Sequence, residues 1–178
     1  MTSAIFAAVR AFLLAALPPG VEVVMAQENR VATPIGTDFV TMTPGPLRER
    51  LATNVDQYSD GFATGMPQKR MAMASTRTTV QIDVHGPSSA DNTQIISTLW
   101  RDSFAVDLFA ATGEAIIPLY TSDPRQMPFD NGEQQVEMRW SIDLVMQLKP
   151  IVTSAQDFAS ALSIGLKEVD AVYPPGKA

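Results

Sequence analysis

The 178-residue sequence contains no cysteine and only one histidine, His85. A chain without cysteine forms no disulfide, no thiolate zinc site and no cysteine nucleophile. One imidazole also leaves little for metal binding or general-base catalysis, two tasks for which proteins often use histidine. These absences exclude most enzyme classes, and we expect no catalytic residue, no metal ion and no cofactor.

Phosphate-binding motifs are absent as well. The sequence has no Gly-x-x-x-x-Gly-Lys-Ser/Thr loop and no Gly-x-Gly-x-x-Gly after a predicted strand, so nothing supports nucleotide binding. The formal net charge of −6 disfavours sequence-independent nucleic-acid binding, because such binding depends on neutralising phosphates. The basic residues of the central region do not alternate with aromatics and are typical of surface ion pairs; they are Lys69, Arg70, Arg77 and Arg101.

Long hydrophobic runs are also missing. The apolar stretch at residues 4–17 is interrupted by Arg10 and has no basic run before it, unlike a signal peptide. Its fourteen residues fall short of the roughly 20 that cross a bilayer, so we expect no membrane anchor. Because its apolar residues share one helical face and Pro-Pro-Gly follows, the stretch predicts a packed amphipathic helix.

The strongest pattern that is present lies at residues 136–148, where every second residue is apolar and the others are mostly polar. Such alternation predicts a β-strand with one buried face. Thirteen residues at about 3.3 Å each give roughly 43 Å, about twice the usual strand length. We expect this strand to cross a whole sheet or project beyond it, and a projecting strand usually needs a partner chain. The alternation around Val80, Ile82 and Val84 predicts the strand that pairs with it.

The remaining patterns complete an α+β fold with a mainly antiparallel sheet of long strands, flanked by the N-terminal helix and one longer central helix. We expect that central helix at about residues 90–111, shorter strands at 21–27, 39–43 and 116–120, and a short helix capped by Ser154. One domain should cover residues 1–178. The segments 57–68 and 121–135 predict long loops at interfaces, and 174–178 a tail.

Charged residues of alternating sign, Glu137, Arg139 and Asp143, share one face of the predicted long strand. They fit two hypotheses equally well. In one they form cross-strand pairs within the sheet. In the other they pair across a subunit boundary, where Trp140 supplies a buried anchor and Pro128 and Phe129 contribute from the neighbouring loop.

Asp83 and His85 also share a strand face, which is the least that a carboxylate-oriented general base requires. A small hydrolase would use such a pair. However, the sequence contains no Gly-x-Ser-x-Gly elbow to supply a nucleophile. Two polar residues on a solvated face are therefore the favoured interpretation.

Four segments carry a resemblance to a known family. They are residues 128–133 (PFDNGE), 136–144 (VEMRWSIDL), 156–158 (QDF) and 169–174 (VDAVYP). In these segments the chain resembles the neck or tail terminator proteins of tailed bacteriophages, in particular the neck-terminator family of contractile-tailed phages. The resemblance is most specific over residues 123–175. No catalytic motif belongs to this family.

The resemblance implies a structural virion protein whose copies close into a ring, a hexamer, that caps the tail tube. Its implied partners are copies of itself, the tail tube protein, connector or portal-side neck proteins, and the sheath where the tail contracts. DNA would pass through without specific binding. The implied location is the virion neck, with assembly in the host cytoplasm. A head-to-tail connector or stopper ring is the alternative from the same structural class.

Overall fold

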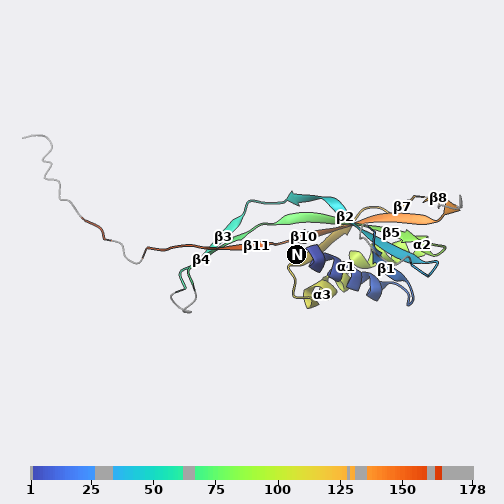
Figure 1. The fold of residues 1–178 in the computed structure, drawn as a ribbon, viewed down its shortest axis with the longest axis horizontal. Coiled ribbons are helices and arrows are strands. Elements are labelled where there is room, and N and C mark those ends of the chain that lie inside the picture. The colour runs from blue at the N-terminus through green and yellow to red at the C-terminus, as the bar shows by residue number, and fades with distance from the viewer. Residues whose placement is uncertain are drawn as a thin grey trace, which may run out of the picture.

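The computed structural model describes residues 2–26, 34–61, 67–127, 129–130, 136–159 and 163–165. These residues form an α+β fold, as predicted (Figure 1). The helices are α1 (Thr2–Ala16), α2 (Ser89–Trp100) and α3 (Ser103–Ala111). The strands are β1 (Glu22–Met25), β2 (Phe39–Arg50), β3 (Val55–Ser59), β4 (Lys69–Met73), β5 (Thr76–His85), β6 (Ile116–Thr121), β7 (Arg125–Gln126), β8 (Phe129–Asp130), β9 (Val136–Glu137), β10 (Arg139–Leu148) and β11 (Ile151–Ala155).

The main sheet has the strand order β1-β2-β5-β10-β6, and β7 pairs with β10 beside β6. Strand β1 runs parallel to β2, and the other neighbours are antiparallel. Strand β10 pairs with β5 over its whole length, from Arg139 opposite His85 to Leu148 opposite Thr76. The predicted pairing of the two alternating segments is therefore confirmed.

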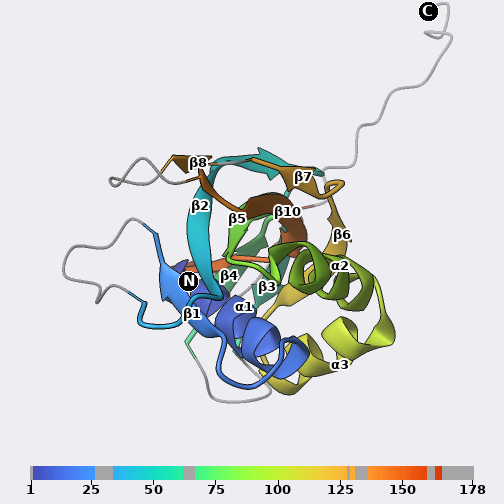
Figure 2. The same ribbon diagram turned by 90° about the vertical axis from the view of Figure 1, so that its right-hand side faces the viewer.

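The three helices cover one face of this sheet (Figure 2). The core between the two layers contains Ile142, Leu144 and Met146 from β10, each fully buried, because alternation turns every second side chain to the helices. The N-terminal helix, predicted from its apolar stripe, contributes Phe12 and Leu13 to the same core. The prediction of α1 is confirmed.

The single central helix predicted at residues 90–111 is wrong, because the chain forms two helices there. Helix α2 ends at Trp100, and the carboxylate of Asp102 accepts a hydrogen bond from the backbone N–H of Phe104 at 2.9 Å, which caps the start of α3. Arg101 lies in the break and donates to the backbone oxygen of Thr121 at 2.6 Å. The apolar periodicity continues through this break, so it concealed the cap.

Strand β11 replaces the short helix predicted after Ser154, since residues 151–155 pair with β4 instead. The predicted loops also contain strand. Residues 57–59 belong to β3, and the segment 121–135 includes the end of β6 together with β7 and β8. The long strand is interrupted at Met138, whose backbone oxygen accepts a hydrogen bond from Gly86 at 3.0 Å. The tail at 174–178 lies outside the described residues.

Strands β3, β4 and β11 form a second sheet in the order β11-β4-β3, which we call the arm. Each arm strand is adjacent in sequence to one of the central strands β2, β5 and β10. Hydrogen bonds from Leu51 to Ser75 at 2.9 Å and from Ala74 to Pro150 at 3.1 Å continue the ladder between the two sheets. The arm therefore extends the main sheet, and Figure 1 shows it projecting past the helices.

Gly86 should be intolerant of substitution. Its φ of +100° is a left-handed conformation, and an added Cβ would overlap the backbone oxygen of Thr37. We expect Gly86→Ala to lower the free energy of unfolding by about 2–3 kcal/mol. Gly113→Ala is the matched control, because Gly113 has a φ of +70° but an added Cβ there meets nothing within 4 Å. This substitution should cost about 1 kcal/mol. Equal losses in urea unfolding would contradict the close packing at Gly86.

Candidate interaction surface

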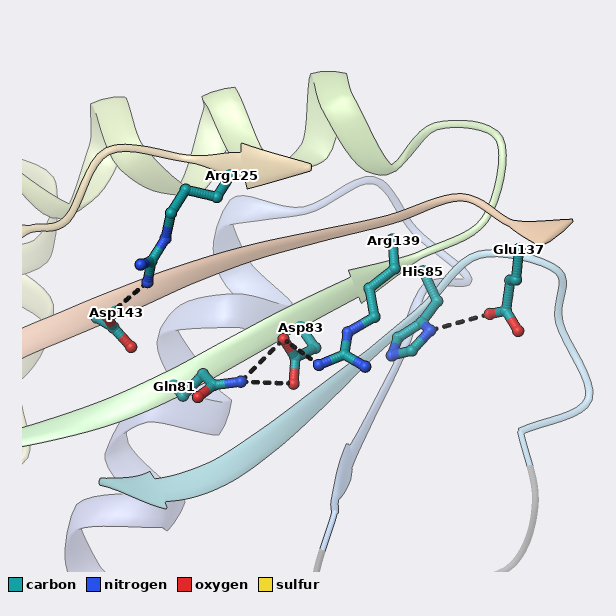
Figure 3. Close-up of polar contacts among 7 residues, drawn as sticks. All are labelled: Gln81, Asp83, His85, Arg125, Glu137, Arg139 and Asp143. Atoms are coloured by element: carbon teal, nitrogen blue, oxygen red, sulfur yellow. Dashed lines mark hydrogen bonds and ion pairs between the residues drawn. The ribbon is translucent and has the colours of Figure 1, made fainter. Parts of the chain in front are cut away.

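A row of polar side chains covers the face of the main sheet that the helices leave open (Figure 3). Strand alternation places it there, opposite the core residues of β5 and β10. We call it the polar row; its members are Gln81, Asp83 and His85 of β5, Glu137 of β9, Arg139 and Asp143 of β10, and Arg125 of β7.

The most buried ion pair of the polar row joins Arg139 to Asp83, with 3.2 Å between Arg139 Nη2 and Asp83 Oδ1. The Asp83 side chain is 7 % exposed and that of Arg139 23 %. Gln81 Nε2 also donates to both carboxylate oxygens of Asp83, at 3.1 and 3.0 Å. A carboxylate this buried requires such partners, so the pair stabilises the strands only while both members are present.

His85 lies at one end of the polar row. Its Nδ1 is 2.9 Å from Glu137 Oε1, and its ring stacks on Phe39 with centroids 4.4 Å apart and planes 7° apart. Asp83 shares the face of His85, as predicted, but its carboxylate contacts Arg139 and Gln81 instead. The geometry thus gives no support to a carboxylate-oriented base formed by Asp83 and His85.

The other ion pairs lie nearer the surface. Arg125 contacts Asp143 at 3.2 Å with its side chain 62 % exposed, and pairs this exposed contribute little stability. Arg77 bonds to Glu49 and donates to the hydroxyl of Tyr120 at 2.9 Å. The hydrogen bond and the charge of Glu49 raise the pKa of Arg77 above its ordinary value.

Three of the four predicted basic surface positions have polar partners of this kind. Arg70 contacts Asp56 at 2.7 Å, and that hydrogen bond raises the pKa of Arg70. Arg101 donates to Thr121, and Arg77 has the partners given above. The prediction of ion-paired surface positions is confirmed for Arg70 and Arg77, while Arg101 donates its hydrogen bonds to uncharged acceptors of Thr121.

The residues predicted for a subunit interface are only partly brought together. Glu137, Arg139 and Asp143 share the polar row and pair within the chain. Trp140 lies on the opposite face of β10, because the strand alternates, and its Nε1 is buried without a hydrogen-bond partner among the described residues. Strand β8, which contains Phe129, pairs with β9, and Pro128 lies outside the described residues. Their place in a subunit boundary stays a prediction.

The arm is the surface that reasoning from sequence missed. Its exposed apolar side chains include Val55 and Tyr58 of β3, at 56 % and 58 %, and Ile151 and Val152 of β11, at 53 % and 67 %. Figure 1 shows that none of the described helices lies over this part of the chain. The signal was the β-branched run Ile151, Val152 and Thr153 directly after Pro150.

One hollow of the described surface lies beside the stacked rings of Phe39 and His85. The hollow beside the stacked pair has a volume of about 430 Å³ and is lined by Phe39, Gly86 and Glu137 among others. No group of three or more histidine or acidic residues able to hold a metal ion occurs in the described part of the chain. None of the described helices is long and apolar enough to cross a membrane.

Comparison with known families gives one decisive match. The model of the phage neck terminator protein family matches residues 3–170. The chain belongs to this family. No curated protein matches it. The resemblance seen in the sequence is confirmed, and the chain is a structural neck protein of the phage virion.

Proposed function

We propose that this neck terminator protein closes with copies of itself into a hexameric ring that caps the tail tube and joins it to the head-side connector. The family match over residues 3–170 carries this proposal. The completed ring would stop tube growth by presenting a face that tube subunits cannot extend. Its other face would then be free to bind a connector or another portal-side neck protein.

The shape of the chain supports a ring. One end contains the helices packed on the main sheet, and the other is the uncovered arm (Figure 1). Neighbouring copies would then meet through unlike surfaces rather than through one self-complementary patch. Contacts of this kind close into a ring when the rotation between subunits permits.

The charge of the chain suits the other proposed contacts. Its net charge of −6 would let DNA pass through the ring without specific binding, because an acidic wall does not attract phosphates.

We place the exposed part of the polar row, together with Pro128 and Phe129, at a boundary with a neighbouring copy. In a contractile tail the outer rim would also contact the sheath, and assembly would take place in the host cytoplasm.

The mass of the purified chain in solution tests the ring. We expect light scattering at several concentrations to give a particle of six times the 19.3 kDa chain mass. Added to polymerising tail tube protein, the ring should bind tube ends and shorten the tubes. A particle that binds portal-side proteins but leaves tube length unchanged would instead identify a connector, and a monomer that never affects the tubes would contradict the proposal.

A further inference from the structure

The outer edge of β11 lacks the features that usually protect an edge strand. All five of its residues are exposed, and none is charged, a proline or a glycine. The edges of the main sheet differ, because β6 contains Pro118 and β1 has only four residues. Natural edges are usually short, charged or interrupted, since an open edge pairs readily with another strand. The outer edge of β11 is therefore suited to pairing with another strand.

The hydrogen bonds of the arm show which backbone groups of β11 have no partner among the described residues. Pro150 accepts from Ala74, and Gln156 donates to Gln68, so residues 150 and 156 direct their polar groups toward β4. Antiparallel ladders alternate, which turns residues 152 and 154 toward β4 as well. The N–H and C=O groups of residues 151, 153 and 155 then point away from the arm.

The same alternation shows which residues of β3 direct their backbone N–H and C=O groups outward. Residues 68, 70, 72 and 74 of the β4 segment direct their backbone groups to β11, so 69, 71 and 73 direct theirs to β3. Their partners are Ser59, Gln57 and Val55. Residues 56 and 58 therefore hold the outward N–H and C=O groups of β3.

The two free edges match each other. Both strands have five residues, and both are antiparallel to β4, so they run parallel to one another. The two strands are also in register with each other across β4, because Thr153 and Gln57 are both opposite Met71. In a parallel ladder, a residue bonds to the two neighbours of the residue opposite it. If Thr153 of one copy lies opposite Gln57 of another, its outward N–H and C=O groups therefore face the outward groups of residues 56 and 58 in that other copy.

We propose that the outer edge of β11 pairs in parallel with the outer edge of β3 in a neighbouring copy, with Thr153 opposite Gln57 of that copy. Thr153 N–H donates to the backbone oxygen of the neighbour's Asp56, and the neighbour's Tyr58 N–H donates to the backbone oxygen of Thr153. The arms then form one continuous sheet around the ring. This inference rests on the proposed ring and names the contact that closes it.

The side chains fit this junction. Val55, Met73 and Ile151 form a row across one face of the arm, and Ile151 would meet Val55 of the next copy, extending an apolar belt around the ring. Asp56 brings no unpaired charge to the uncharged edge of β11, because Arg70 of its own arm contacts it at 2.7 Å. A second copy of the chain is the partner that fits this edge best. In a closed ring, every β11 edge pairs with the β3 edge of the next copy, so no arm edge is left unpaired.

Disulfide trapping tests the junction in a chain without native cysteine. In the double variant Gln57→Cys with Thr153→Cys, the two sites of one chain lie on opposite sides of β4, about 10 Å apart, which is too far for a disulfide. Across the proposed junction they are about 4.8 Å apart at Cα, which a disulfide spans. We expect mild oxidation to link most chains into a ladder ending at the ring size, at least tenfold above each single variant.

The control for chance collision is Gln57→Cys with Gln94→Cys, which carries the same number of exposed cysteines, one of them on α2. A ladder as strong in this control would overturn the proposal. Dimers formed by Thr153→Cys alone would show that two β11 edges meet, which also overturns it. If light scattering still shows a ring but no disulfides form, the junction is wrong while the proposed function stands; if the chain neither forms a ring nor changes the length of the tubes, both fail.

A proline gives an independent measurement. Thr153→Pro removes only an N–H that points away from the arm, so the ladder to β4 remains intact. We expect this variant to keep the circular dichroism spectrum of the wild type and to lose the ring mass. Thr153→Ala removes the same side chain but keeps the N–H, and should assemble normally. Equal assembly of the two variants would overturn the junction.

Discussion

Replacing Phe12 with alanine is expected to lower the free energy of unfolding by about 3–5 kcal/mol. The Phe12 ring is fully buried and lies between the helices, with its centroid 5.0 Å from Trp100 and 6.4 Å from Phe109. Truncation removes the contacts of the Phe12 ring with α2 and α3 and leaves a cavity that this packed cluster cannot easily fill. A loss of this size is a large fraction of the roughly 5–15 kcal/mol by which domains are stable.

Urea unfolding measures this effect, and tryptophan fluorescence reports it because Trp100 contacts the substituted position. Leu14→Ala is the matched control on the same helix, since Leu14 is 46 % exposed. Its loss should be within about 0.5 kcal/mol of zero. Similar losses for the two variants would show that α1 does not pack on the other helices through Phe12.

The second large effect is expected from Arg139→Glu. From sequence alone, this reversal should block oligomerisation and leave the monomer folded. The structure alters that prediction, because the new carboxylate would face Asp83, whose side chain is 7 % exposed. Removing one partner of a buried ion pair costs about 3–5 kcal/mol, and we expect about 3 kcal/mol here because Arg139 keeps some contact with water. The monomer itself should lose stability, as measured by urea unfolding.

The double variant Asp83→Asn with Arg139→Gln separates folding from assembly. It removes both charges and keeps groups that can hydrogen-bond, so it should recover most of the stability lost in Arg139→Glu. If the double variant is stable and still forms the ring, Arg139 acts only within the sheet. If it is stable but fails to assemble, Arg139 lies at a subunit boundary. A double variant as unstable as the reversal would contradict the pairing of Arg139 with Asp83.

Prediction from sequence was most accurate where burial has a clear period. The alternation along β10 and β5 gave both strands and their pairing, because each has one face on the core and one on the polar row. The stripe of α1 gave that helix for the same reason. The break between α2 and α3 was not predicted from the sequence, since the capping Asp102 lies within an apolar pattern that continues on both sides.

Local signals were misleading where a distant strand decided the structure. Ser154 has the chemistry of a helix cap, yet residues 151–155 form a strand because β4 offers a free edge beside them. The contacts of the polar row likewise depend on which strands lie side by side. Its alternating charges were visible in the sequence, whereas the partners of Glu137 and Arg139 depend on the register of β5 against its neighbours.

The sequence by itself determined the class of this protein. The lack of cysteine, the single histidine and the alternating segments pointed to a structural α+β subunit, and the motifs at residues 128–174 pointed to the neck terminators, which the family match establishes. Only the tertiary structure decided which strands continue into the arm and which strand edges have no partner among the described residues. Periodicity records whether a residue is buried, but the identity of its neighbour across a sheet depends on contacts between residues far apart in the chain.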